Sequence, residues 1–226
     1  MTTDPAYLEK CRKDLTKRWS DLTSFVSDAI REKWLAMIDE RYAPRPFHGL
    51  AHLEHMMQLF DEHKDSLKDR YAVAFAIFFK HLEYDPLNAE EAERNEERLR
   101  EFAAETTFDQ ANYVSRLLLE SANNCTDAHL TPDKYGDDDL HFLIDFDTAW
   151  MGVDEGEYTK FREAARSEVG NLNDKDYIER RLKVLQLFLQ IPNIFATKVM
   201  RDKYESQARK NIKSEIEFLN SLAKSA

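Results

Sequence analysis

Three histidines recur at steps of four and three residues in the segment RPFHGLAHLEHMMQLF, residues 45–60. In a helix, His48, His52 and His55 would lie within roughly 60° of one another on one face. Imidazole nitrogens bind divalent metals and exchange protons near neutral pH. The spacing therefore predicts a helix over about 48–63 that presents histidines to a site. The alternative is a helix whose histidines are only hydrogen-bonded side chains. The neighbouring face is apolar, with Leu53, Met56, Met57 and Phe60.

Two other segments place ionisable residues among bulky apolar ones. Lys80 and His81 end the run AVAFAIFF, and Asp145 and Asp147 lie within LHFLIDFDTAWMG. Burying a charge is costly unless the charge is paired or bound to a metal. We therefore expect both segments to meet the histidine helix at one pocket. Two alternatives stay open. The tips of Lys80 and His81 would reach solvent at a helix end, or the aspartates would serve as a helix cap and an ion-pair partner.

Helical periodicity and proline breaks define the elements that must position these residues. Apolar spacing predicts one bent helix or two helices over 6–42, before Pro44 and Pro46 end the run. Further helices are expected over 69–82, which should be buried, over 89–104, which is highly charged, and over 109–124. The segment 125–139 is the longest expected loop, and helices follow at about 155–169, 174–190 and from 194 to about 222. No stretch alternates with period two, so the sequence predicts an all-α protein.

The composition excludes several function classes. The 226 residues include only five glycines, which argues for helices and against phosphate-cradling loops. A net charge of −11 argues against general nucleic-acid binding, although a local pocket for a small phosphorylated molecule remains allowed. Two cysteines, Cys11 and Cys125, are too few for a disulfide framework. With no signal-peptide or membrane-span pattern, we expect a cytoplasmic protein that does not bind membranes; its oligomeric state is not predicted.

Six segments of the chain, by their residues and by their order, resemble the HD superfamily of metal-dependent phosphohydrolases. The resemblance is to its branch of predicted HD phosphohydrolases in particular. The six segments span about residues 41–216. The resemblance implies a single-domain HD-like helical bundle over 1–226, with helices of residues 1–40 packing on it. The matching segments are RPFHGLAHLEH, AIFFKHLEYDP, RNEERL, LIDFDTAWMG, RRLKVLQLFL and YESQARKNIKSEI.

The resemblance also implies a role for individual residues. His52 corresponds to the first metal ligand of the family, and Asp147 corresponds to the last. His48 matches the histidine that protonates the leaving oxygen. Glu96 matches a carboxylate that positions water or supports the site, although its charged surroundings also fit a solvated helix face. The implied cofactor is a divalent zinc, iron, manganese or magnesium ion, which lowers the pKa of bound water for attack on phosphorus.

Two further residues are expected to support this site without binding the metal directly. Asp145 is the neighbour of the implied ligand Asp147 in LIDFDTAWMG. His55 is expected to pack beside the ligands of the histidine helix.

The sequence departs from the family at its signature, since the His-Asp dyad reads Lys80-His81 here. An ammonium group cannot bind a cation, whereas His81 can still offer a nitrogen. One hypothesis is a phosphohydrolase with a rearranged site in which His52, His81 and Asp147 hold the metal. A second is a catalytically inactive HD-fold protein that binds a ligand or a protein and holds no metal. In that case Lys80 would be the substitute cation, paired with Asp147 or Asp145. A third is a purely structural helical module.

Overall fold

Every regular element that the structure describes is a helix. The computed structural model describes residues 4–86 and 90–225, which contain eleven α-helices and two 3-10 helices. An isolated parallel bridge between Gly136 and Thr197 is the β pairing found among these residues. The all-α prediction is confirmed. The chain divides into two compact units, residues 1–123 and 124–226, and the prediction of one domain over 1–226 stays a prediction.

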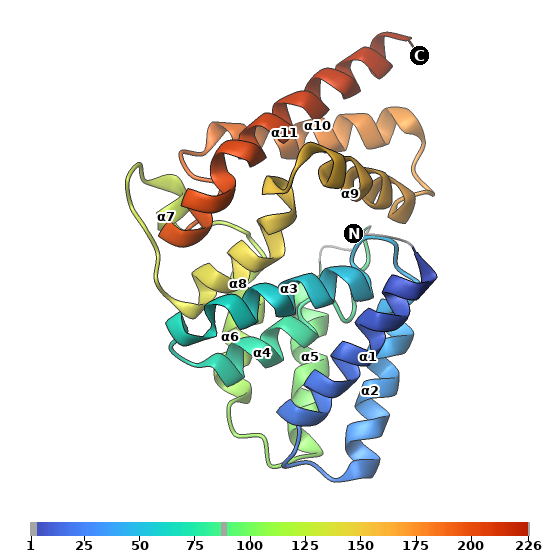
Figure 1. Ribbon diagram of the computed structural model, residues 1–226, viewed down its shortest axis with the longest axis vertical. Coiled ribbons are helices and arrows are strands. Elements are labelled where there is room, and N and C mark those ends of the chain that lie inside the picture. Colours follow the sequence, from blue (N-terminus) through green and yellow to red (C-terminus); the bar gives the residue numbers. More distant parts are fainter. Residues whose placement is uncertain (1–3, 87–89, 226) are drawn as a thin grey trace. The chain divides into compact units, whose positions relative to one another are not determined.

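The first unit holds six α-helices among its described residues, and Figure 1 shows α1 and α2 side by side. The indole N–H of Trp19 on α1 donates to the carbonyl of Arg31 on α2 at 3.1 Å. A 3-10 helix, η1, connects α3 to α4. The elements are α1 (Pro5–Leu22), α2 (Asp28–Tyr42), α3 (Leu50–His63), η1 (Lys64–Ser66), α4 (Arg70–Phe79), α5 (Glu91–Ala104) and α6 (Ala111–Ser121).

Helix α4 forms the centre of the first unit. It contacts α3, α5 and α6, and all of its residues from Ala72 to Phe79 are buried. The ring of Trp19 packs edge-on against Phe78, with centroids 5.1 Å apart. Such a helix, apolar on all sides, is stable only inside a core. The sequence prediction of a buried helix is confirmed here.

The second unit is organised around the long helix α11, which packs against η2 and α10. The carboxylate of Glu215 on α11 is fully buried and accepts from Arg181 on α10 at 2.8 Å and from Tyr158 on α9 at 2.5 Å. The elements are α7 (Asp127–Leu130), α8 (Asp139–Thr148), η2 (Ala149–Gly152), α9 (Glu155–Glu168), α10 (Asp174–Gln190) and α11 (Lys198–Ser225).

Several expected boundaries need correction. The run 6–42 forms two helices, which is one of the two expected arrangements, whereas the histidine helix begins at Leu50 instead of residue 48. The expected loop 125–139 contains the short helix α7, which begins with a capping box between Thr126 and His129. Lys80 and His81 follow the last residue of α4 and belong to a turn. Residue 89, the first of the helix expected over 89–104, lies outside the described residues. Within the described ranges, no helix combines the length and apolarity needed to cross a bilayer.

Candidate functional site: a histidine cluster

The turn before α3 positions His48. Pro44 and Pro46 prevent the chain from continuing as a helix after α2, and Gly49 is the N-cap of α3. A Cβ atom at Gly49 would collide with the carbonyl oxygen of Arg45, so the tight approach of these two backbone segments requires glycine. His48 therefore lies just before the helix. His52, in the first turn of α3, is 1 % exposed and stacks on Phe47 with ring centroids 5.6 Å apart.

The turn of residues 80–84 positions His81, and neighbouring helices fix its backbone. The hydroxyl of Tyr42, at the end of α2, accepts from the backbone N–H of His81 at 3.2 Å. Arg45 donates to two carbonyl oxygens of the turn. Asn95 on α5, which is 1 % exposed, accepts from one backbone N–H of the turn and donates to one carbonyl. These hydrogen bonds hold the turn in a single conformation, as a preorganised site requires.

These two segments bring three imidazoles together in what we call the histidine cluster, made of His48, His52 and His81. The ring centroids are 5.7 Å apart for His48 and His52, 4.6 Å for His48 and His81, and 5.7 Å for His52 and His81. All three residues belong to the first unit. His81 is 7 % exposed and His48 is half-buried. The sequence expectation that the histidine helix and the end of the buried helix converge is borne out within this unit.

A carboxylate that the sequence reasoning missed orients one of these rings. Nδ1 of His81 lies 2.7 Å from a carboxylate oxygen of Glu91. Because a carboxylate only accepts, Nδ1 is the donor in this contact and Nε2 lies on the side of the ring away from Glu91, as in the carboxylate–histidine pairs behind many metal sites. Burial alone would raise the pKa of Glu91, but His81, followed by His48 and Lys80, lowers it below its ordinary value.

Lys80 is buried next to the cluster. It is 7 % exposed, and its ammonium group donates to the hydroxyl of Ser121 on α6 at 3.1 Å. Ser121 is fully buried and in turn donates to the carbonyl of Leu118. The alternative in which Lys80 and His81 reach solvent is wrong, since both side chains lie in the interior at the end of α4.

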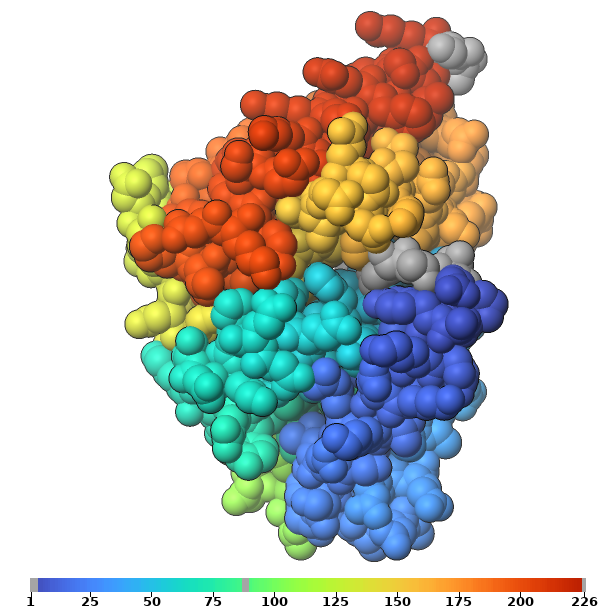
Figure 2. All heavy atoms as spheres, viewed as in Figure 1, coloured from blue at the N-terminus to red at the C-terminus, as the bar shows by residue number. Residues whose placement is uncertain are grey.

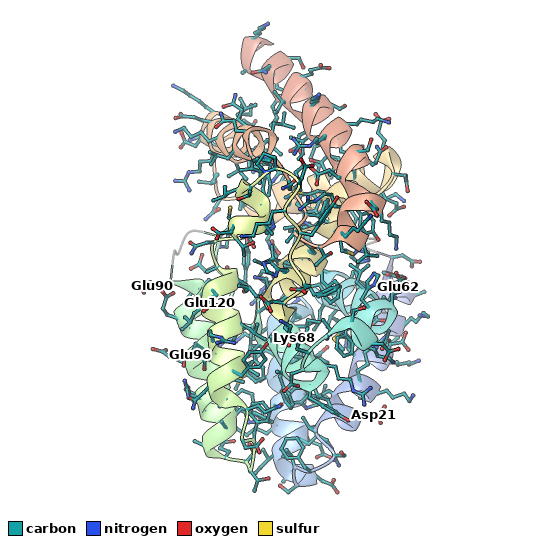
Figure 3. The ribbon with its side chains drawn as sticks, turned by 90° about the vertical axis from the view of Figure 1, so that its left-hand side faces the viewer. Asp21, Glu62, Lys68, Glu90, Glu96 and Glu120 are labelled. Atoms are coloured by element: carbon teal, nitrogen blue, oxygen red, sulfur yellow. The ribbon has the colours of Figure 1, made fainter. Side chains whose placement is uncertain are left out.

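The predicted carboxylate Glu96 lies elsewhere in the first unit. It accepts from Arg100 on the same helix at 2.6 Å and from Ser115 at 2.9 Å, and the second contact joins α5 to α6. Figure 3 shows Glu96 on the α5–α6 side of this unit, with Glu62 on the α3 side. Hydrogen bonds from Arg100 and Ser115 lower the pKa of Glu96 against the effect of burial. Glu91, five residues earlier on the same helix, is the carboxylate that contacts a histidine of the cluster. His55 lies on α3 and is half-buried.

The two predicted aspartates belong to the second unit. Both carboxylate oxygens of Asp145 accept hydrogen bonds there, from the backbone N–H groups of Ala196 and Thr197 at 2.8 Å and from the Thr197 hydroxyl at 2.7 Å. Asp145 thus fixes the turn before α11, and its pairing with Lys80 stays a prediction. Asp147 lies on α8 and is 8 % exposed. Its role as a metal ligand stays a prediction.

Aromatic and cationic groups complete the surroundings of the cluster. The ring of Tyr84 lies over His48 with centroids 3.9 Å apart, and the guanidinium of Arg45 lies 5.8 Å from the centre of the Tyr84 ring. Tyr84 lies in HLEYDP and Arg45 lies in RPFH. Both residues could have been found from the sequence, because these segments also carry His81 and His48. In RNEERL it is Asn95, beside the predicted Glu96, that contacts the turn.

Comparisons with known protein families, curated proteins and solved structures find no match to this chain. The residues of the site themselves indicate which ligands it can bind. Three imidazoles, one of them oriented by Glu91, suit a borderline divalent metal such as zinc, iron or manganese better than magnesium, which prefers oxygen ligands. The same imidazoles, with the Lys80 ammonium nearby, also suit an anion such as a phosphate group.

Proposed function

We propose that the histidine cluster is the ligand site of a phosphohydrolase-like protein with a degenerate metal site. The ligand would be a nucleotide or another small phosphorylated molecule. One observation carries this proposal: three imidazoles lie within 5.7 Å of one another, beside a lysine that is only 7 % exposed. Such a group of nitrogen donors can satisfy several oxygens of a phosphate at once.

Each residue of the site has a distinct part in this proposal. Lys80 supplies a fixed positive charge, whose electrostatic effect is strong because the ammonium is withdrawn from water. His48, the most accessible of the three histidines, would protonate a leaving oxygen. Glu91 holds the ring of His81 so that Nε2 faces away from the carboxylate. Tyr84, whose ring lies tilted against His48, offers an aromatic face for a base or another flat group.

A divalent metal is compatible with part of this site. His52 and His81 would hold it through ring nitrogens, and the family resemblance adds Asp147 as a third ligand. When bound, the metal would supply a Lewis acid that lowers the pKa of water. The positive charge of Lys80 opposes such binding, because Lys80 directly precedes a proposed ligand in the chain. The proposal therefore includes a weak metal affinity.

The second candidate is an inactive HD-fold protein that binds a ligand or a protein without hydrolysis. The burial of Lys80 and its hydrogen bond to Ser121 favour this candidate, because a lysine held in the interior supplies the charge that a metal would otherwise provide. Both candidates share the phosphate site, and they differ in turnover.

The test combines binding and metal content. Calorimetric titration with adenosine monophosphate should show one site, weakened at least about tenfold by His52→Ala or by Lys80→Met. His63→Gln, a change at the last residue of α3, is the matched control and should bind within twofold of the natural chain. Equal binding by all four proteins would remove the histidine cluster as the ligand site.

Hydrolysis separates the two candidates. Purified protein is analysed for zinc, iron and manganese and assayed with p-nitrophenyl phosphate. Turnover that rises with added metal supports the phosphohydrolase, and binding without turnover supports the inactive protein. The double change Lys80→His, His81→Asp should create metal binding at near-stoichiometric occupancy. If the natural chain already binds metal as tightly as this variant, the degenerate-site argument is wrong.

A further inference from the structure

The second unit contains a cavity that the proposed function does not use. It has a volume of about 530 Å³ and lies among α9, α10 and α11. Figure 2 shows the atoms of α9 and α11 adjoining on one face of this unit, and Tyr158 and Glu215 join the same two helices. A cavity of this size falls in the range that holds small organic ligands. Its wall includes two arginines and four apolar residues: Arg162, Arg166, Ile178, Phe218, Leu219 and Leu222.

The floor and mouth of this cavity are apolar. Ile178 is 8 % exposed and Leu219 is 2 % exposed, so both form its closed side. Phe218 and Leu222 follow at helical spacing on α11 and remain 42 % and 41 % exposed. Large apolar side chains that stay this open at the edge of a cavity gain free energy when a ligand covers them.

One of the two arginines in the cavity wall is already occupied. The guanidinium of Arg166 donates to Asp174 at 2.8 Å and to the carbonyl oxygens of Val169 and Leu172 at 3.1 and 3.0 Å. It also lies over the ring of Tyr177, 4.6 Å from its centre. Arg166 therefore ties the α9–α10 connection together, and three of its five N–H donors are already used there.

Arg162, one turn earlier on α9, is in a different position. Its guanidinium lies 4.3 Å from the centre of the Phe218 ring, and within residues 4–86 and 90–225 it makes no ion pair. A half-buried guanidinium over an aromatic face keeps its five N–H donors available for an acceptor. Glu163, the carboxylate next to it in the wall, is exposed, so water screens its repulsion of an anion.

We infer that this cavity binds a small amphipathic monoanion, of the fatty-acid or aryl-carboxylate class. The carboxylate pairs with Arg162, and the apolar body covers Phe218, Leu219 and Leu222. Among the described residues of the cavity wall, Arg162 is the cation without an ion pair. Its charge favours an anionic head group, and the apolar floor favours an apolar tail. This inference concerns the second unit alone and does not depend on the function proposed for the histidine cluster.

Decanoate is the probe, with decanol as its neutral counterpart, and binding to the full chain is measured by calorimetry. Arg162→Met should weaken decanoate at least about tenfold and leave decanol within twofold. Leu222→Trp should weaken both ligands, because the larger ring fills the cavity. Arg180→Met, which removes an exposed arginine from α10 outside the cavity wall, is the matched control and should change neither affinity.

Circular dichroism establishes that each variant is folded, which is expected because Leu222 and Arg180 are exposed. Decanoate affinity that is unchanged in both Arg162→Met and Leu222→Trp would overturn the inference. So would an equal loss in Arg162→Met and Arg180→Met, which would show only a general charge effect. A chain that sediments as a dimer and becomes a monomer on Leu222→Arg would show that a second copy covers the cavity, which would also overturn it.

Discussion

The second unit should lose stability in mild acid because of one buried histidine. His129 is fully buried on α7, and its Nδ1 accepts from the backbone N–H of Thr126 at 2.9 Å. Its Nε2 has no hydrogen-bond partner among the described residues. Burial lowers the pKa of His129 from 6.5 to about 4, and the positive charges of His141 and Arg201 add to this effect. A proton on Nδ1 would also break the hydrogen bond that begins α7.

The sign and size of the effect follow from linkage. Between pH 6.5 and about 4 the unfolded chain binds a proton at this histidine and the folded chain does not. The free energy of unfolding therefore falls as the pH falls through this window. At about 1.36 kcal/mol for each pKa unit, the difference between 6.5 and about 4 corresponds to a loss of about 3 kcal/mol.

The assay compares urea unfolding of the natural chain and His129→Gln at pH 7.0, 5.5 and 4.0. The glutamine amide oxygen can still accept from Thr126, as in an ordinary capping box, but it does not titrate. At pH 7 the free energy of unfolding of the variant should be within about 1 kcal/mol of that of the natural chain. By pH 4 the difference between the two should have changed by about 3 kcal/mol in favour of the variant. His63→Gln is the control, and hydrogen exchange of residues 124–152 assigns the loss to the second unit. If the natural chain and His129→Gln lost equal stability between pH 7.0 and 4.0, His129 would not be the cause of the acid sensitivity.

Three changes elsewhere should destabilise the chain by amounts that calorimetry or urea unfolding can measure. Arg181→Met leaves the buried carboxylate of Glu215 without its cation and should cost about 3–5 kcal/mol, with Arg180→Met near zero as its control. Asp145→Asn replaces one acceptor oxygen by an N–H donor that faces the backbone N–H groups before α11, and should lower stability by about 2–3 kcal/mol. A loss below about 0.5 kcal/mol, which is the effect of a surface change, would contradict the structural role of Asp145. Gly49→Ala forces the turn before α3 apart and should lower both stability and phosphate binding, and unchanged binding would contradict the need for this tight turn.

Much of the fold could be predicted from the sequence because long helices carry strong periodic signals. The buried helix α4 and the core face of α6 were evident from their apolar residues alone. The exact start of α3 was not, because histidines at helical spacing looked like part of it, whereas Gly49 caps the helix one residue later than His48. The short helix α7 escaped notice because its four residues are too few for any periodicity.

The candidate site was predicted in part. Spacing suggested that His48 and His52 act together, and the end of an apolar run suggested that Lys80 and His81 join them. The choice between carboxylates could not be made in the same way, since RNEERL and its flanks hold many acids and only the packing of α5 places Glu91 against His81. The hydrogen-bond partners of Asp145 could not be predicted either, because the backbone N–H groups that it binds belong to residues 51 and 52 positions later in the chain. Its expected supporting role beside Asp147 stays a prediction.

The most direct test of the histidine cluster is nuclear magnetic resonance of protein labelled with ¹⁵N at its histidine rings, titrated with adenosine monophosphate. We expect the ring signals of His48, His52 and His81 to shift together and saturate, while those of His129 and His141 in the second unit stay in place. Rings of the cluster that do not respond at saturating nucleotide, or all seven histidines responding alike, would contradict this expectation.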